Sequence, residues 1–370
     1  MTGEGMHRMC SCLCMLAILL VSNGGCKKTS EEAQQAATLR ILAWVGYDEP
    51  EFIKPLEQQL GIRIEVKTYV GGDQMYSLFR AAPPGTYDVV IVDAEYGERM
   101  YREGLIRSLD RNLWHSPDLF SPFLAGDPVQ VDGNVYGAVV RWGALGLVYN
   151  RDHINPDEAK SYKVLWAPSS KGKVGIFDWY LPNMGVISRY LGNARPYDLD
   201  EKALQQVKDA LRRLRPQVRA IHPNTGDVIN DLRSGEVWLC PGIGEWASAV
   251  LEEEGKPIDW TVPSEGGVMW VEALAIPTSS KNSGTAQRFI DTVRLPEHLA
   301  RLSWRKAYHS QSPRREAYSQ LSTKQRAILQ AENLDEIQSL INRLAVRKLP
   351  GPQTTEKEWI QAWMLFKTEQ

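Results

Sequence analysis

The sequence predicts an α/β fold, because strand-like apolar segments alternate with helical patterns along much of the chain. Residues 39–44 read as a strand, and a helical pattern begins at Pro50. Residues 87–92 form a continuous apolar run, which is typical of a strand buried in a parallel sheet. The chain has 370 residues, of which 43% are hydrophobic and 24% charged, which is sufficient for two soluble domains. Such alternation favours a layered α/β architecture.

Each element of the first part of the chain has its own signal. The helix from Pro50 has apolar residues at helical spacing and ends at Gly61. Strict alternation then predicts a half-exposed strand over residues 62–66, and the next helix stops before Pro83. After the strand at residues 87–92, helical character returns over residues 100–105.

The second part continues this pattern. The strand-like stretch at residues 136–149 is interrupted by Gly143 and Gly146 and is suited to carry the chain from one lobe to another. A second α/β unit starts within residues 164–176. Helices are expected over 204–214 and 228–232, strands near Val237 and over 268–276, and mostly helices beyond Pro277.

The N-terminus reads as an export signal. Arg8 precedes an apolar run over residues 9–21 that is short for a membrane span, so we expect a signal peptide over residues 1–25. Small residues before Cys26 resemble a bacterial lipoprotein box, although Asn23 departs from it, so lipidation of Cys26 is expected, with simple cleavage nearby as the alternative. Residues 26–37 are predicted to be a flexible tether.

Several functional classes receive no support from the sequence. There is no P-loop, no dinucleotide-binding glycine motif, no H-E-x-x-H and no nucleophile elbow, and the six His residues are scattered. A net charge of −2 does not indicate the excess of positive charge that is typical of a nucleic-acid-binding protein. Gly242 to Glu245 form a glycine-rich turn that lacks the lysine of a phosphate site. We therefore expect no enzyme, no catalytic residues, no metal and no cofactor.

One strand combines an indole with a carboxylate. Trp270 and Glu272 are two residues apart within the strand expected over 268–276, so their side chains share a face. An aromatic face beside a carboxylate suits an organic cation. The alternative is a buried strand with Trp270 in the core and a solvated Glu272.

An ordered set of segments then resembles the periplasmic spermidine/putrescine-binding proteins of ABC transporters. The matching pieces, in chain order, are Trp44 to Tyr47, Gly85 to Val90, Glu103 to Ile106, Trp142 to Ala144, Lys171 to Val174, Pro257 to Asp259 and Glu265 to Pro277. Each piece is short, but their order along residues 39–366 is specific.

The resemblance implies a type II periplasmic-binding fold with two lobes joined by crossover strands and a ligand cleft between them. Lobe 1 is expected to comprise residues 38–141 and 272–312, and lobe 2 residues 142–271 and 313–370. It also implies a monomeric, extracytoplasmic or periplasmic solute-binding lipoprotein, anchored in the membrane through Cys26. Such a protein binds a polyamine-like amine and delivers it to an ABC permease.

The resemblance also implies a set of ligand-binding residues. They are Trp44, Tyr47, Asp93, Glu95, Tyr96, Asp178, Trp179, Trp270, Glu272, Tyr308 and Gln353. Asp93, Glu95 and Tyr96 match a loop of the family, with Asp93 and Glu95 replacing Ser and Tyr. The family's other acids are replaced by Gly46, Trp179 and Pro182, so the expected ligand is cationic but not necessarily spermidine.

Two alternatives stay open at this stage. The same fold can bind another solute, such as a thiamine-like molecule, an iron complex or an anionic metabolite. For a free anion, Arg141 is the one basic candidate near the cleft. A lipoprotein that senses its ligand without transport is the second alternative.

Overall fold

The computed structural model describes residues 37–368, and the expected leader, most of the tether and Cys26 lie outside them. Its strands are β1 (Thr38–Trp44), β2 (Arg63–Tyr69), β3 (Val89–Asp93), β4 (Gln130–Val131), β5 (Asn134–Val135), β6 (Ala138–Asn150), β7 (Val174–Phe177), β8 (Val218–His222), β9 (Leu239–Gly244), β10 (Ile258–Thr261), β11 (Gly267–Ala275) and β12 (Leu344–Val346).

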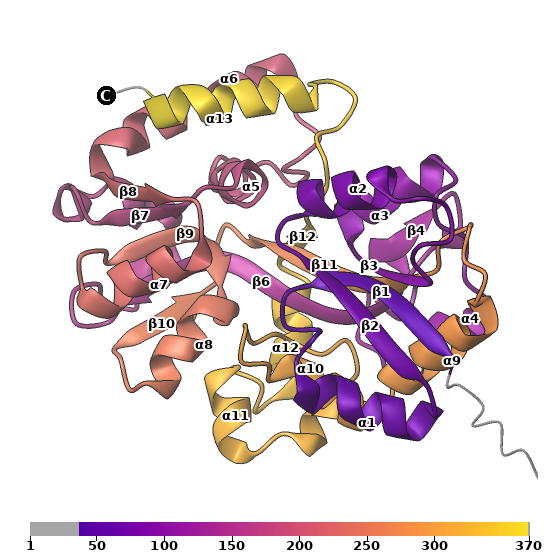
Figure 1. Ribbon diagram of the computed structural model, residues 1–370. Helices are drawn as coiled ribbons and strands as arrows, with labels where there is room; N and C mark the ends of the chain where they lie inside the picture. The colour runs from indigo at the N-terminus through magenta and orange to yellow at the C-terminus, as the bar shows by residue number, and fades with distance from the viewer. Residues whose placement is uncertain (1–36, 369–370) are drawn as a thin grey trace, which may run out of the picture. The chain divides into compact units, whose positions relative to one another are not determined.

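The helices cover the sheet and follow most of its strands (Figure 1). They are α1 (Pro50–Leu60), α2 (Gly72–Ala81), α3 (Ala94–Arg102), α4 (Arg111–Trp114), α5 (Tyr180–Tyr190), α6 (Glu201–Leu214), α7 (Thr225–Ser234), α8 (Glu245–Glu253), α9 (Ser283–Val293), α10 (Pro296–Ser303), α11 (Thr323–Ile328), α12 (Leu334–Ile341) and α13 (Glu356–Thr368). No helix within residues 37–368 combines the length and apolar character needed to cross a bilayer.

Ten strands form one sheet with the order β2-β1-β3-β11-β6-β9-β7-β8, while β10 pairs with β6 and β12 with β11. We call β1, β2 and β3 the first strand group, and β7, β8, β9 and β10 the second strand group. The long strand β6 pairs with β11 along its first half and with β9 and β10 along its second half. In Figure 1, β6 is the magenta strand that runs from one group to the other.

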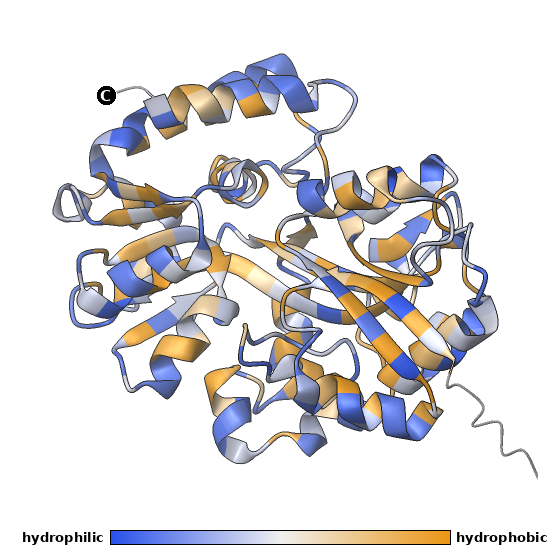
Figure 2. Cartoon of the chain, viewed as in Figure 1, coloured by the Kyte–Doolittle hydropathy of each residue, from blue (hydrophilic) through white to orange (hydrophobic). Residues whose placement is uncertain are grey.

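Apolar side chains on both faces of the sheet explain why the strands are buried. On β1, Leu42 belongs to one hydrophobic cluster, whereas Leu39 and Ile41 belong to the cluster on the opposite face. The edge strand β2 alternates between orange and blue in Figure 2, in keeping with the half-exposed strand expected there. The second strand group has its own pair of clusters.

The packing near the C-terminus differs from the expected lobe boundary. Tyr318, Ile337 and Ile341 pack in the same hydrophobic cluster as Leu42 of the first strand group, although residues 313–370 were assigned to lobe 2. Helix α13 packs against α5 and α6, beside the second strand group (Figure 1). The division into two lobes stays a prediction.

Candidate functional site

Three charged side chains form a row across the middle of the sheet. Glu272 on β11 is paired in register with Asp93 on β3 and with Arg141 on β6. Side chains of directly opposed residues project from the same face of a sheet and lie close together. The strand register therefore brings two carboxylates beside one guanidinium, and all three side chains are buried.

Glu272 is fully engaged within the protein. Its two carboxylate oxygens accept hydrogen bonds from the Tyr47 and Tyr308 hydroxyls, each at 2.7 Å. The Arg141 Nε lies 4.0 Å from Glu272 Oε2, and the guanidinium lies 3.9 Å from the centre of the Tyr308 ring. Burial and the Glu272 charge raise the pKa of Tyr47, so its hydroxyl stays a proton donor. The three predicted ligand-binding residues Tyr47, Tyr308 and Glu272 thus contact one another, and Arg141 lies beside the acid. Their role in ligand binding stays a prediction.

A second arginine binds the other two predicted acids. Arg347 directly follows β12, and its Nε lies 2.6 Å from Glu95 Oε1 while its Nη2 lies 3.2 Å from Asp93 Oδ1. The guanidinium carbon lies 4.3 Å from the centre of the Trp179 ring. Burial raises the pKa of Asp93, as does the neighbouring Glu95 charge, and Arg347 opposes both effects. We call Arg347, Asp93, Glu95 and Trp179 the Arg347 cluster.

The position of Asp93 and Glu95 requires a correction. We expected both on a loop, but helix α3 begins at Ala94, and Asp93 is its extended N-cap residue. The reason is that the chain turns directly from a buried strand into the helix, with Glu95 in its first turn, where an acid is favoured. The acids are consequently held by strand register and helix geometry.

The predicted tryptophans fall into two groups. Trp44 lies 6.5 Å from Trp179 and 5.2 Å from Tyr69, measured between ring centres. Trp270 meets Tyr308 edge to face at 6.2 Å. The first group borders the Arg347 cluster and the second borders Glu272.

A further buried acid lies beside Trp270. Glu245 is the first residue of α8, directly after β9, and it is 0% exposed. Its Oε2 accepts a hydrogen bond from the Ala144 amide at 3.1 Å, whereas Oε1 has no partner among the described residues. Burial raises the pKa of Glu245 to about 8.

Gly143 leaves space for this acid and for the indole. A Cβ atom on Gly143 would lie 1.8 Å from Glu245 Oε1 and 2.4 Å from Trp270 Nε1, and this indole nitrogen also lacks a partner within residues 37–368. A carboxyl oxygen and an indole N–H thus face the same glycine. Sequence reasoning missed Glu245 as a site residue, although a lone acid after an apolar strand and a glycine turn was its signal.

The other three predicted residues have partners elsewhere. Asp178 accepts hydrogen bonds from Trp363 and Lys367 of α13, at 2.7 and 2.8 Å. The Tyr96 hydroxyl donates to Asp73 at 2.6 Å. Gln353 is exposed, and its amide lies 3.5 Å from Asp198. The structure therefore does not bring these three side chains to Glu272.

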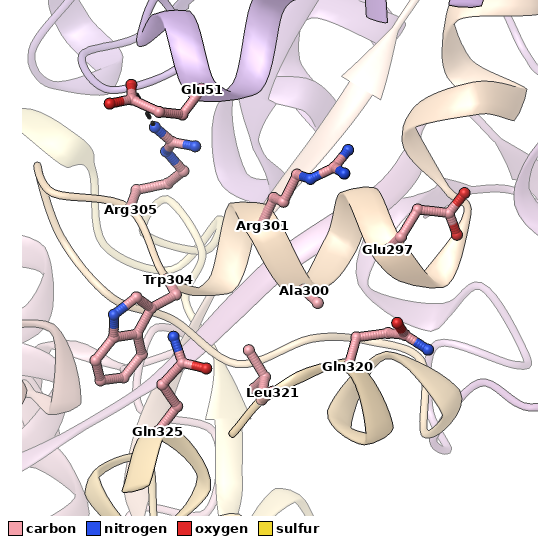
Figure 3. Close-up of a pocket in the computed structure, with 9 residues that line it drawn as sticks. All are labelled: Glu51, Glu297, Ala300, Arg301, Trp304, Arg305, Gln320, Leu321 and Gln325. Carbon is pink, nitrogen blue, oxygen red and sulfur yellow. Dashed lines mark ion pairs between the residues drawn. The ribbon is translucent and has the colours of Figure 1, made fainter. Parts of the chain in front are cut away.

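A surface pocket of about 400 Å³ lies at a different place (Figure 3). It is bordered by α10 and α11, and Arg305 lies 3.8 Å from Glu51 at its edge. None of the eleven predicted ligand-binding residues lines it. Within residues 37–368, no group of three or more His, Cys, Asp or Glu side chains is arranged to hold a metal ion.

Comparison with known proteins places this geometry in context. Residues 51–326 match the family of bacterial extracellular solute-binding proteins. The spermidine/putrescine-binding periplasmic protein of Escherichia coli K12 is 28% identical over 276 residues, which are 73% of this chain and 76% of the relative. A putrescine/agmatine-binding protein of Pseudomonas aeruginosa PAO1 is 22% identical over 317 residues, covering 79% and 83% of the two chains.

Solved structures agree on the fold. The spermidine/putrescine ABC transporter substrate-binding protein PotD of Streptococcus pneumoniae superposes with a TM-score of 0.71 at 21% identity, over 90% of this chain and 99% of its own. A PotD lipoprotein of Treponema pallidum gives a TM-score of 0.70 at 19% identity, over 89% and 99%. The predicted type II periplasmic-binding fold is confirmed.

Proposed function

Because the chain belongs to the family of bacterial extracellular solute-binding proteins, we propose that it is the solute-binding component of an ABC transporter and that it binds a small organic cation related to polyamines. Its partner is then a membrane permease that receives the solute. The names of the relatives in Escherichia coli and Pseudomonas aeruginosa support an amine as the solute.

The observation on which the proposal rests is that the buried Glu245 carboxyl and the Trp270 indole face the same glycine, Gly143. Glu245 forms no ion pair within the described part of the chain, and its Oε1 faces Gly143 beside the Trp270 indole. A buried acid without a partner is costly in its charged form. An ammonium group at this position would form a charge-assisted hydrogen bond with Glu245 and a cation–π contact with Trp270.

A comparison of binding free energies supports the need for this carboxylate. Micromolar affinity corresponds to about 8 kcal/mol, while one desolvated cation–π contact supplies about 2 kcal/mol. Association itself costs several kcal/mol. Aromatic contacts alone are therefore insufficient, and at least one carboxylate has to bind the cation.

A thermal-shift panel tests the proposal. We expect at least one of n-butylamine, choline, putrescine, agmatine and spermidine to raise the melting temperature, because a solute that binds only the folded state stabilises it. Neutral sugars serve as controls. A panel in which no amine acts while a sugar or a dicarboxylate does would contradict a cationic solute.

A zwitterionic solute is the second candidate, and one observation favours it. Arg141 is 0% exposed, and its Nη1 has no hydrogen-bond partner among the described residues. Its charge lowers the pKa of Glu245, so a guanidinium and a carboxyl group lie within electrostatic reach of each other. Adding γ-aminobutyrate and betaine to the panel separates this candidate, since both have an amine-type cation and a carboxylate.

The location and assembly of the protein are part of the proposal. The relatives named above include periplasmic proteins, and we propose that this chain acts outside the cytoplasm, anchored through a lipid on Cys26 and monomeric. Closure of two lobes around the solute is proposed as its working motion. Mass spectrometry of the mature N-terminus tests the lipid, and native mass spectrometry tests the monomer.

A further inference from the structure

Arg347 has the contacts expected of a bound cation. Its guanidinium forms ion pairs with two buried carboxylates and lies over the face of one indole. Charge-assisted hydrogen bonds and a cation–π contact are the interactions by which a protein binds an alkylammonium or alkylguanidinium ligand. The Arg347 side chain itself is 2% exposed, so solvent does not compete for these contacts.

The sheet topology explains why this side chain reaches the acids. Strand β12 is parallel to β11 and pairs with its first residues, Gly267 to Met269. Strand β3 is antiparallel to β11 and pairs with its last residues, Glu272 to Ala275. The carboxyl ends of β3 and β12 therefore point toward each other along β11, and the Arg347 amide continues the ladder by donating to the Met269 carbonyl at 2.7 Å.

One acid of this cluster keeps an unused acceptor. Glu95 Oε2 has no hydrogen-bond partner among the described residues, whereas the Trp44 indole acts as a hydrogen-bond donor toward Asp93. One guanidinium thus serves two carboxylates without satisfying all their oxygens. Arg305 likewise pairs with two acids, Glu49 and Glu51, but it has no aromatic face against it in the contacts described for residues 37–368.

We propose that the Arg347 side chain acts as a tethered guest, by which we mean that it occupies a cation subsite that a ligand could otherwise fill. Asp93, Glu95 and Trp179 form this subsite, so the solute itself has a single positive charge. This inference rests on the proposed function for the solute, but the occupied subsite can be tested separately. A diamine needs an acid at each end, and the other two predicted acids already have partners: Asp178 is paired with Lys367, and Glu272 lies between Tyr47, Tyr308 and Arg141. The remaining place for an ammonium is beside Glu245 and Trp270.

The test removes the Arg347 side chain and adds a small free guanidinium compound in its place. In Arg347→Ala, ethylguanidinium is expected to raise the melting temperature by several degrees more than it does in the wild type, because it replaces the missing group. Putrescine and agmatine are expected to gain at least tenfold in affinity over the wild type, measured by calorimetry. The affinity for n-butylamine is expected to stay within threefold, since its single cation binds elsewhere.

Arg305→Ala is the matched control, because it also removes a buried arginine paired with an acid. Equal rescue of both variants by ethylguanidinium would show a generic effect and overturn the inference. If Arg347→Ala does not fold alone, Arg347→Gln replaces it, because the amide keeps a hydrogen-bond donor for Glu95 while the charge is removed. No gain for putrescine in that variant also overturns the inference.

The two proposals fail differently. If the wild type binds an amine and the Arg347 variants gain nothing, the proposed function stands and the tethered guest is refuted. If the wild type binds no amine but ethylguanidinium rescues Arg347→Ala, the subsite stands and the cationic solute is refuted.

Discussion

Glu245 shows how burial determines the state of one side chain. The carboxyl is enclosed between Gly143 and Trp270, and backbone amides, among them that of Ala144, are its hydrogen-bond donors. Desolvation raises its pKa from 4.5 to about 8, so it is mostly protonated at neutral pH. A cation that binds here has to displace that proton.

This leads to a prediction for pH. Amine affinity should rise between pH 6 and pH 8.5, and binding at pH 7 should release close to one proton, measured by calorimetry in buffers of different ionisation enthalpy. Glu245→Gln should abolish the proton release and weaken binding about tenfold at pH 8.5, because the charge-assisted bond is lost. Glu236→Gln, which alters an exposed acid paired with Arg219, should change neither quantity.

The raised pKa of Glu245 also makes the free energy of unfolding depend on pH. The folded pKa is raised, so the folded protein holds a proton that the unfolded chain releases between about pH 4.5 and pH 8. The contribution of Glu245 to the unfolding free energy therefore falls as pH rises through this window. Glu245→Gln should flatten that part of the urea-denaturation profile, and an unchanged slope would contradict the assignment.

For single residues, the sequence indicated which side chains lie near one another better than it indicated their hydrogen-bond and ion-pair partners. The convergence of Tyr47, Tyr308 and Glu272 followed from a resemblance that fixes their places in the fold. Arg347 was not predicted as a neighbour of Asp93 and Glu95 because it is far from them along the chain, and only the strand register brings them together. Three of the predicted acids, Asp93, Glu95 and Glu272, lie beside arginines, and nothing local in the sequence indicated that pairing.

Strand β6 is the element on which the site depends most. It crosses the junction of the two strand groups and places Gly143 opposite Trp270 in the ladder with β11. Any side chain at Gly143 would overlap both Glu245 and Trp270. The glycine is therefore required for close approach, not for an unusual backbone conformation.

Gly143→Ala should accordingly lower both affinity and stability. Overpacking a buried position costs about 1–3 kcal/mol, and moving Glu245 or Trp270 should weaken amine binding more than tenfold. Urea denaturation and calorimetry measure the two effects. Gly284→Ala is the control, because no atom lies within 4 Å of its new Cβ in helix α9, and it should leave binding unchanged.

The long elements were the predictable ones. Continuous apolar runs indicated β3 and β11, and Pro50 and Gly61 marked the limits of α1. The three-residue strand β12 was missed, since so short a segment has no periodicity and forms only by pairing with β11. Helix α5 was not predicted, although Pro182 lies in its first turn, where proline is tolerated.

At the scale of the whole described chain, one side chain links elements that follow different strand groups. Glu356 of α13 lies 2.6 Å from the Arg99 guanidinium of α3 and accepts a hydrogen bond from Tyr180 of α5 at 2.9 Å. These contacts join the two expected lobes away from Glu245 and Glu272. If the proposed closure of two lobes occurs, these contacts stabilise the conformation described here.

Glu356→Gln should therefore weaken solute binding without touching the solute. A partly exposed ion pair contributes about 0.2–1 kcal/mol, which corresponds to a loss in affinity of up to about fivefold. Glu98→Gln removes a comparable ion pair inside helix α3 and should have no effect on affinity. Equal losses in both variants would argue against a link between lobes.

The carboxyl ends of β3 and β12 meet along β11, and this arrangement affects how the ligand specificity of such a protein can evolve. Successive residues of a strand alternate between faces, so deleting one residue just before Leu344 would turn Arg347 to the far side of the sheet. The vacated acids would then be open to a second ammonium group. Under the proposal that the solute has a single positive charge, we expect the loss of one codon in this surface turn, without any substitution among the contact residues, to let the protein accept a diamine.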